Sequence, residues 1–177
     1  MGKWIIDPDH SVAAFSVRHM MVANVRGQFN QITGFVQMDK DNKKIDFIEA
    51  HIKAEGIFTG IKKRDEHLRS PDFFDVDKYP EITFTSAEIE GDTKGSFRVR
   101  GHLTIHGITR FVSCSDVKFA GPVKSPFGGE LTIGLSAVLE INREDFGITW
   151  NEPLEGGGVL VSKEVRLFID AEADLVE

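Results

Sequence analysis

Apolar and polar residues alternate along several long stretches of this chain. Between Phe97 and His106 the apolar residues and Gly101 occupy the odd positions, and polar residues occupy the even ones. The same parity returns in residues 131–142, and again in residues 161–175, where Lys163 breaks it. Because successive side chains on a strand point to opposite faces, this alternation predicts a sheet with one apolar face and one solvated face.

Turn residues divide the chain into a series of such segments. We expect strands at residues 4–6, 11–20, 25–39, 45–58, 81–90, 96–106, 109–121, 129–142, 147–150 and 160–175. Strands of about ten to fourteen residues are longer than the usual five or six. Eight or so antiparallel strands favour an up-and-down barrel over a sandwich, although periodicity alone does not report closure. We therefore predict an all-β fold, an eight-stranded antiparallel barrel, and one domain that spans residues 1–177.

Residues 62–74 do not follow the strand pattern. The run from Lys63 to Arg69 suits a short helix, which Pro71 would end. Phe73 and Phe74 follow in the same insertion, and on a turn or at a helix end both rings can contact the mouth of the barrel. The pair forms either a hydrophobic gate or a plug that caps the core, and the sequence does not decide between them.

The composition of the chain narrows the classes of function. Its 177 residues carry a formal net charge of −7 and include 14 Phe, 2 Trp and 1 Tyr. The negative charge argues against a nucleic-acid partner and against an electrostatic hold on anionic lipid surfaces. The apolar runs are only a few residues long, so we expect no stable membrane insertion. A phenylalanine-rich interior suits purely hydrocarbon contacts, although it also suits an ordinary core without a ligand.

The N-terminal residues and the cysteine content bear on location and redox chemistry. Residues 1–8 run directly into acid and proline and lack the apolar core of a secretory signal. We therefore expect a cytoplasmic location if the chain is complete, and a periplasmic one if it is a trimmed mature form. Cys114 is the single cysteine, which excludes an internal disulfide, and we expect a small core residue there rather than a nucleophile.

Seven segments, spread over the chain in a fixed order, resemble a known family. They are 4–11 (WIIDPDHS), 15–20 (FSVRHM), 25–29 (VRGQF), 63–76 (KRDEHLRSPDFFDV), 79–84 (YPEITF), 101–110 (GHLTIHGITR) and 142–150 (NREDFGITW). Through them the chain resembles the YceI-like family of lipocalin-shaped, polyisoprenoid-binding proteins. The resemblance implies an extended, lipocalin-like barrel of eight antiparallel strands with a long isoprenoid or related lipid in its bore. Some family members lie in the bacterial periplasm, and some relatives are joined to membrane cytochromes, which implies quinones as one ligand class.

The inward-facing apolar residues are the candidate ligand-binding residues of such a bore. We predict that they include Phe15, Val17, Met20, Phe29, Ile52, Leu68, Phe73, Phe74, Phe84, Val99, Leu103, Ile105, Leu135, Leu139, Phe146, Trp150 and Leu167. Small inward residues would leave room for a ligand, and these are Ala50, Ala54, Gly101, Ala137 and Ala171. A buried methylene contributes about 0.8 kcal/mol and a head-group hydrogen bond about 1 kcal/mol, so the length of the tail should dominate affinity. An eight-stranded barrel can also fill itself with side chains, so a solid core is the alternative.

Charged residues gather in the helical insertion, at Arg64, Asp65, Glu66, His67 and Arg69. As catalysts they would need a partner nucleophile or a metal, and no such partner is evident. We therefore expect a solvated helix with an internal ion pair. A polar anchor at the mouth of the barrel is the intermediate interpretation, to which Arg18, His19 and Arg143 could contribute.

The histidines and the glycine run do not have the spacing of a metal or phosphate site. His102 and His106 share a strand face, but they lie roughly 13 Å apart on an extended chain, at or beyond the reach of one ion. The residues Gly156, Gly157 and Gly158 lack the lysine and the helix that follow a phosphate-binding loop, so we expect a flexible hairpin loop. We predict neither a metal nor a cofactor.

The sequence supports three functions, in decreasing order. The first is a non-enzymatic carrier or store for a long isoprenoid or fatty amphiphile, such as a quinone or a polyprenyl species. The second is an enzyme that acts on such lipids, with His67, Asp65 or His19 as acid–base groups. The third is a structural or interaction module with a filled interior, which would form a homodimer.

Overall fold

The computed structural model describes residues 1–39, 41, 43–91 and 93–176. Within them the chain forms 11 strands. These are β1 (Gly2–Ile6), β2 (Val12–His19), β3 (Ala23–Asn30), β4 (Thr33–Asp39), β5 (Lys44–Lys53), β6 (Ile57–Phe58), β7 (Glu81–Glu90), β8 (Ser96–Ile105), β9 (Ile108–Lys124), β10 (Leu131–Asn142) and β11 (Val161–Leu175). The helical elements are α1 (Lys62–Arg69) and two short 3-10 turns, η1 (Ala54–Gly56) and η2 (Arg143–Phe146).

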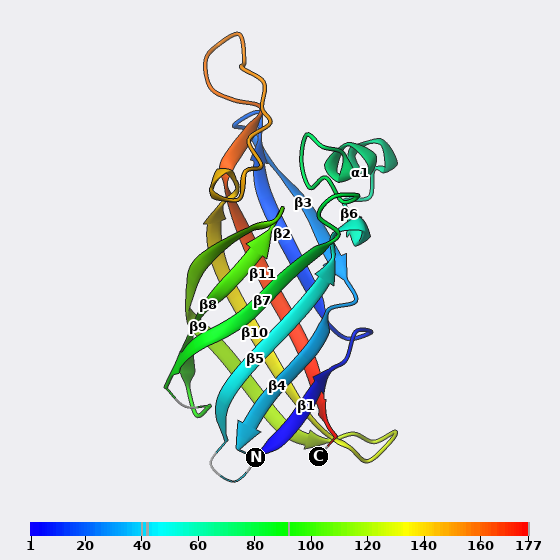
Figure 1. The fold of residues 1–177 in the computed structure, drawn as a ribbon, viewed down its shortest axis with the longest axis vertical. Coiled ribbons are helices and arrows are strands. Elements are labelled where there is room, and N and C mark those ends of the chain that lie inside the picture. The colour runs from blue at the N-terminus through cyan, green and yellow to red at the C-terminus, as the bar shows by residue number, and fades with distance from the viewer. Residues whose placement is uncertain (40, 42, 92, 177) are drawn as a thin grey trace.

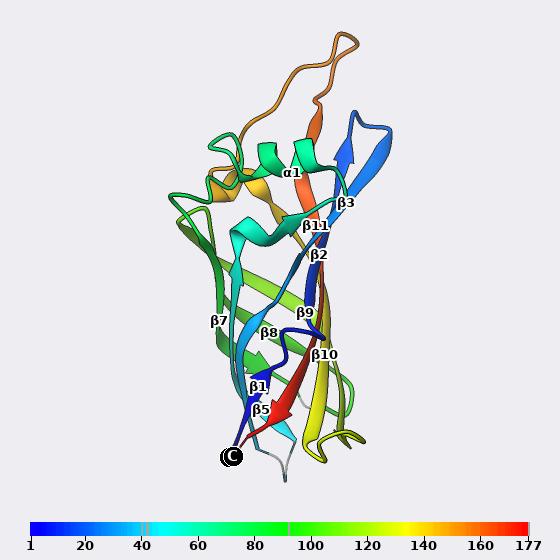
Figure 2. The same ribbon diagram turned by 90° about the vertical axis from the view of Figure 1, so that its right-hand side faces the viewer.

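The strands pair in antiparallel fashion, and the sheet closes on itself. The ring runs β1–β4–β5–β7–β8–β9–β10–β11, and β11 returns to β1 through the pair formed by Trp4 and Leu175. These strands confirm the predicted eight-stranded antiparallel barrel (Figure 1). Both chain termini lie at one end of the barrel, which we call the lower end, and α1 lies across the other, upper end (Figure 2).

Two ring strands are continued toward the upper end by separate strands. Along β11, Ile6 of β1 pairs with Ala173, and Val12 of β2 pairs with Asp170, so β2 extends the line of β1. β3 pairs with β2, and β6 pairs with β3. In the upper part of the wall, β2 and β3 thus continue the lines of β1 and β4 beside β11, and the two-residue strand β6 ends this side of the sheet.

The single strand predicted over residues 25–39 is wrong in its boundaries. The structure has β3 and β4 instead, separated at Gln31, whose left-handed backbone (φ of 59°) does not fit a continuous strand. The buried residues change from odd to even numbers across this break, from Phe29 to Val36 and Met38. Residues 45–58 are likewise divided, here by η1. Strand breaks therefore let the same face of the wall remain apolar while the chain bends.

The strand predicted over residues 147–150 is also wrong. Gly147 ends η2 in a left-handed conformation, with φ of 73°, and the amide of Ile148 donates to the carbonyl of Arg143 at 3.2 Å. The backbone turns here instead of extending. The short helix is confirmed, because α1 covers Lys62–Arg69 and stops before Pro71.

The lower end of the barrel is filled by its own side chains. Trp4, Val36 and Met38 are fully buried there, and Ile133 is nearly so. These residues come from β1, β4 and β10, so they close the interior from several sides. The barrel interior is therefore blind at the lower end.

Candidate functional site

The interior above this closed end holds two neighbouring apolar cavities. The cavity nearer the termini, the inner chamber, has a volume of about 180 Å³, and the cavity beneath α1, the outer chamber, has a volume of about 160 Å³. A single water molecule needs only about 10–15 Å³. Both chambers are lined by Ile52, Ile82, Leu103, Leu167 and Ile169, so they meet at one level of the barrel.

The walls of the inner chamber are almost entirely aliphatic and aromatic. Its lining residues are Ile6, Ile32, Val36, Ile48, Ala50, Ile52, Ile82, Thr83, Phe84, Val99, Leu103, Val112, Cys114, Val117, Leu135, Ser136, Ala137, Leu139, Leu167, Ile169, Ala171 and Ala173. The polar atoms of Thr83 and Ser136 are the minor exceptions. Cys114 is buried, and its Sγ donates to the carbonyl of Val138 at 3.5 Å. Cys114 thus packs as a small wall residue.

The outer chamber is equally apolar, with one charged side chain in its wall. Its lining residues are Ala13, Ala14, Phe15, Val17, Phe29, Ile52, Leu68, Phe73, Phe74, Ile82, Leu103, Ile105, Ile141, Arg143, Phe146, Ile148, Val161, Val165, Leu167 and Ile169. Strand alternation places most of these residues on the inner face, and the α1 insertion supplies Leu68, Phe73 and Phe74.

All but two of the predicted ligand-binding residues line one of the chambers. Met20 does not, because it sits in the β2–β3 turn with a left-handed backbone (φ of 51°). Trp150 does not either, because its ring packs against Phe73 at a centroid distance of 5.3 Å and against His67 at 4.9 Å. Whether the lining residues bind a ligand remains a prediction.

The small inward residues leave space for a ligand at some positions and not at others. Ala50, Ala137 and Ala171 line the inner chamber, whereas Ala54 is buried outside both linings. A Cβ atom at Gly101 would lie 2.4 Å from the carbonyl oxygen of Thr85 and 2.8 Å from the ring of Phe84. The expectation that Gly101 leaves space is therefore wrong: the neighbouring strand fills it.

Sequence reasoning also missed several lining residues. Ile169 and Val165 follow the same parity as the predicted Leu167, and Ile82 shares a face with Phe84, so alternation could have found them. Ile32 lies at the break between β3 and β4, where the inner face changes from odd to even positions. The polar pair Asn30-Gln31 and the change of parity from Phe29 to Ile32 mark this break in the sequence and could have found it.

Aromatic rings connect the α1 insertion to the barrel wall. The ring of Phe74 packs edge-on against Phe29 at a centroid distance of 5.5 Å, and Phe29 lies 6.0 Å from Phe15. Phe73 packs on the other side against Trp150. We call residues 62–76 the lid, because α1 and the segment after it cover the upper end of the outer chamber (Figure 2).

The charged cluster of α1 fastens the lid to the barrel. Arg69 donates from Nε to the carbonyl of Glu55 at 2.8 Å and from Nη2 to that of Ile57 at 2.9 Å. Arg64 donates to Oγ1 and the carbonyl oxygen of Thr59, and Asp65, which is 5% exposed, accepts from the amide of Thr59 at 2.9 Å. The expected solvated helix is therefore wrong for these residues.

An ion pair within α1 is nevertheless present. Lys62 Nζ lies 3.8 Å from Glu66, and both side chains are exposed. Such pairs contribute little to stability.

Arg143 is the charged residue in the wall of the outer chamber. Its guanidinium is buried and donates to the backbone carbonyls of Ser162 (2.9 Å), Ile148 (2.7 Å) and Val161 (3.3 Å). Burial lowers the pKa of Arg143, and the nearby Glu144 carboxylate opposes this. An arginine remains charged even so. It joins the end of β10 to the start of β11, and all three of its side-chain nitrogen atoms donate to backbone carbonyls, so the wall of the outer chamber remains almost entirely apolar.

The acid–base candidates do not reach the chambers. His67 Nε2 pairs with Asp72 Oδ2 at 2.8 Å, and Asp65 is engaged by Thr59. His19 lies at the end of β2, and Arg18 donates to the carbonyl of Met21 at 2.8 Å. In the described part of the chain, neither the three acid–base candidates, His67, Asp65 and His19, nor the anchor candidate Arg18 lines either chamber.

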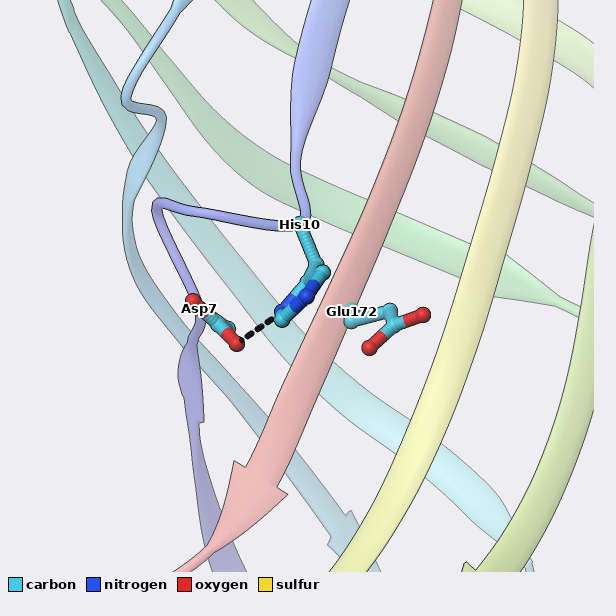
Figure 3. A group of neighbouring side chains, drawn as sticks. All are labelled: Asp7, His10 and Glu172. Atoms are coloured by element: carbon cyan, nitrogen blue, oxygen red, sulfur yellow. Dashed lines mark hydrogen bonds and ion pairs between the residues drawn. The ribbon is translucent and has the colours of Figure 1, made fainter.

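Asp7, His10 and Glu172 converge on the outside of the barrel, where the β1–β2 break crosses β11 (Figure 3). Their ligand atoms lie within 4.8 Å of one another. His10 Nδ1 lies 2.6 Å from Asp7 Oδ2, and this hydrogen bond lowers the pKa of Asp7 and raises that of His10. The amide of Asp7 donates to the carbonyl of Glu172 at 2.9 Å, so the group fastens the break to β11.

In the described residues, no helix has the length and apolar character needed to cross a membrane.

The sequence and the fold both place the chain among known proteins. Residues 4–173 match the model of the YceI-like domain, so the chain belongs to the YceI-like family. It is 36% identical over 177 residues to UPF0312 protein SAS2572 of Staphylococcus aureus strain MSSA476, with all of both chains covered.

Two solved structures share the fold. One is BcnA of Burkholderia cenocepacia, with a TM-score of 0.79, 23% identity, and 94% of this chain and 98% of that chain covered. The other is a polyisoprenoid binding domain from Saccharophagus degradans, with a TM-score of 0.69, 14% identity, and 99% of this chain and 100% of that chain covered.

Proposed function

We propose that this chain binds a long-chain isoprenoid or a related amphiphilic lipid, of polyprenyl or quinone type, and carries or stores it in the two chambers. The observation that carries the proposal is the interior itself, in which two neighbouring apolar cavities share five lining residues above a lower end that buried side chains fill. An extended hydrocarbon tail gains about 0.8 kcal/mol per methylene buried there. The shared fold with the Saccharophagus degradans polyisoprenoid binding domain supports the same ligand class.

The blind lower end favours one orientation of the ligand. The tail occupies the inner chamber, because that chamber offers only apolar wall and two hydroxyl groups. The polar end lies toward the outer chamber, because buried side chains close the interior at the lower end.

Native mass spectrometry of protein purified from a bacterial host, followed by organic extraction, tests this proposal. We expect a mass increase that corresponds to one lipid per chain, and an extract that contains a polyprenyl or quinone species. An unliganded mass from a host with intact lipid pools would count heavily against the proposal.

A series of polyprenols of increasing length tests the part played by the tail. We expect affinity to rise with each added isoprene unit until both chambers are filled, and then to level off, because further carbons would remain in water. Equal affinity for short and long tails with the same head group would contradict a tunnel that recognises the tail.

A further inference from the structure

The turn between β2 and β3 exposes three consecutive apolar side chains at the upper end of the barrel. Met20, Met21 and Val22 are 47%, 52% and 76% exposed. We call these residues the hairpin tip. Both views place this hairpin beyond α1, on the side of the molecule away from the termini (Figures 1 and 2).

The backbone of the hairpin tip does not suit the residues that it carries. Met20 and Met21 both have left-handed backbones, with φ of 51° and 60°, and the amide of Val22 donates to the carbonyl of His19 at 3.1 Å. Turns whose two central residues both have positive φ angles favour Asn, Asp and Gly, because in other residues the Cβ atom comes too close to the following carbonyl oxygen. The two methionines are neither buried nor favoured by the turn, so fold stability does not account for them.

Half-buried apolar residues lie between the hairpin tip and the outer chamber. Val161 of β11 pairs with His19 next to the tip, and Val165 pairs with Val17 one step below. Val25 of β3 pairs with Val17 from the other side. Val17, Val161 and Val165 all line the outer chamber. Because the lower end is closed, a ligand enters from this upper end.

The charges around the hairpin tip do not give a surface of one sign. β2 and β3 carry no acidic residue, and Arg18 and Arg26 are exposed. Glu152 and Glu155 are exposed in residues 151–160, the loop that contacts the hairpin through the Met20 amide and the Leu160 carbonyl (2.8 Å). A partner is therefore held by apolar contact. Three side chains are too few for a stable protein interface, which buries about 1,000 Å² or more.

We propose that the hairpin tip docks on the surface of a phospholipid bilayer and places Met21 and Val22 among the head groups, so that a lipid passes into the outer chamber without crossing water. Flexible methionine side chains suit an irregular apolar surface. This inference rests on the proposed function, because a carrier of a bilayer lipid has to collect its cargo there.

Flotation with phosphatidylcholine vesicles tests the docking. The variant Met21→Gly with Val22→Thr removes two apolar side chains, and glycine suits the backbone at position 21. We expect the fraction of protein that floats to fall about tenfold, because apolar burial is lost, while the thermal midpoint stays equal or rises. The matched control is Phe127→Ser, which removes a side chain that is 97% exposed in the loop between β9 and β10, at the lower end. We expect it to float like the wild type.

Several outcomes would overturn the docking proposal. These are a wild type that does not float, a double variant that floats as well as the wild type, and a Phe127→Ser variant that loses binding. A hairpin tip that instead holds a second copy would show as a dimer that the double variant dissociates, without flotation.

Flotation combined with native mass spectrometry distinguishes failure of the docking proposal from failure of the proposed function. Native mass spectrometry that finds no lipid in a wild type whose flotation depends on the tip would remove the carrier role and leave the docking surface in place. Vesicles with added phosphatidylglycerol should float the protein to the same extent, because Glu152 and Glu155 offset the arginines.

Discussion

Ala137 and Val138 are neighbours on β10, and their side chains point to opposite sides of the barrel wall. Ala137 lines the inner chamber, whereas Val138 is 45% exposed on the outer surface. Substitutions at these two positions therefore distinguish a change in the volume of the cavity from a change in the stability of the strand.

We predict that Ala137→Phe weakens binding of a long isoprenoid. The added ring occupies space that would hold two or three methylenes, which corresponds to about 2 kcal/mol, or roughly 30-fold in the dissociation constant. Val138→Phe adds the same ring outside the barrel and should leave the affinity unchanged. Titration of both variants with one polyprenol, checked by thermal unfolding, gives the comparison. Equal affinities would place the ligand elsewhere.

The Asp7–His10 contact makes a pH-dependent contribution to stability. The pKa of His10 is raised, so its contribution is fully present below the ordinary value of 6.5 and is lost as the pH rises through the raised value. The pKa of Asp7 is lowered, so its contribution is present above the ordinary value of 3.8 and is lost as the pH falls through the lowered value. The contact therefore stabilises the fold most between these two ordinary values.

We predict that Asp7→Asn moves the pKa of His10 back down, which NMR titration of the imidazole measures. The stability difference between the wild type and Asp7→Asn should be larger at pH 5.5 than well above the pKa of His10. A pKa of His10 that is unchanged in Asp7→Asn would refute the assignment of the shift to this hydrogen bond.

At the residue scale, most of the residues predicted from the sequence do line the chambers. The prediction failed at Met20, because the turn took that residue out of the strand, and at Trp150, because no strand forms there. It left the role of Arg143 open, because its acceptors are backbone carbonyls contributed by β11 and by Ile148. Such contacts depend on tertiary structure, and no pattern of residues in the sequence predicts them.

Among the elements, the lid is fastened mainly by arginine contacts to the backbone near η1 and β6. Arg69 reaches two carbonyls there, whereas Lys62, on the same helix, makes only an exposed ion pair with Glu66. Arg69 thus connects the lid to the barrel, whereas Lys62 makes a contact within the lid.

We predict that Arg69→Met speeds release of a bound lipid. Hydrogen bonds from a charged donor contribute about 1.5–3 kcal/mol, so release should accelerate by about tenfold or more while the barrel remains folded. The matched variant Lys62→Met should release lipid at the wild-type rate. Stopped-flow transfer to acceptor vesicles and hydrogen exchange of α1 measure both effects. Identical rates for the two variants would show that the lid does not limit release.

Element boundaries were the least predictable part of the fold. The sequence identified the long strands and α1, but it joined β3 to β4 and extended a strand over residues 147–150. Both errors arise where a left-handed residue, Gln31 or Gly147, breaks the backbone. At Gln31 the apolar positions also change from odd to even numbers, a signal that the prediction of one strand overlooked. The charged α1 residues were also misread, because their acceptors are carbonyls of residues 55–59 that no charge pattern reveals.

For the whole molecule, the proposed function rests on closure of the sheet and on the cavities within it. Alternation predicted long two-faced strands, the number of strands favoured a barrel over a sandwich, and the family resemblance implied the same barrel. None of these could establish that the interior is hollow, because hollowness depends on how side chains from all the strands meet at each level. Phe84 fills the space beside Gly101, for example, whereas Ala137 and Ala171 leave theirs open.

We predict that a bound lipid protects Cys114 from thiol reagents. Cys114 lines the inner chamber and is the single cysteine of the chain, so a tail that occupies this chamber should slow labelling by monobromobimane about tenfold or more. The control is Ser113→Cys combined with Cys114→Ser, which moves the thiol to the adjacent, exposed position. It should label at the same rate with and without lipid. Lipid that binds without protecting Cys114 would place the tail outside the inner chamber.

The amide of Val176 donates to the carbonyl of Lys3 at 3.0 Å, so the two ends of the chain meet beneath the sealed floor of the barrel. A tether attached at either terminus would therefore hold the molecule by its closed lower end. Fusion partners, affinity handles and immobilisation chemistry can therefore be added at both termini, and the upper end stays free for a lipid to enter and leave.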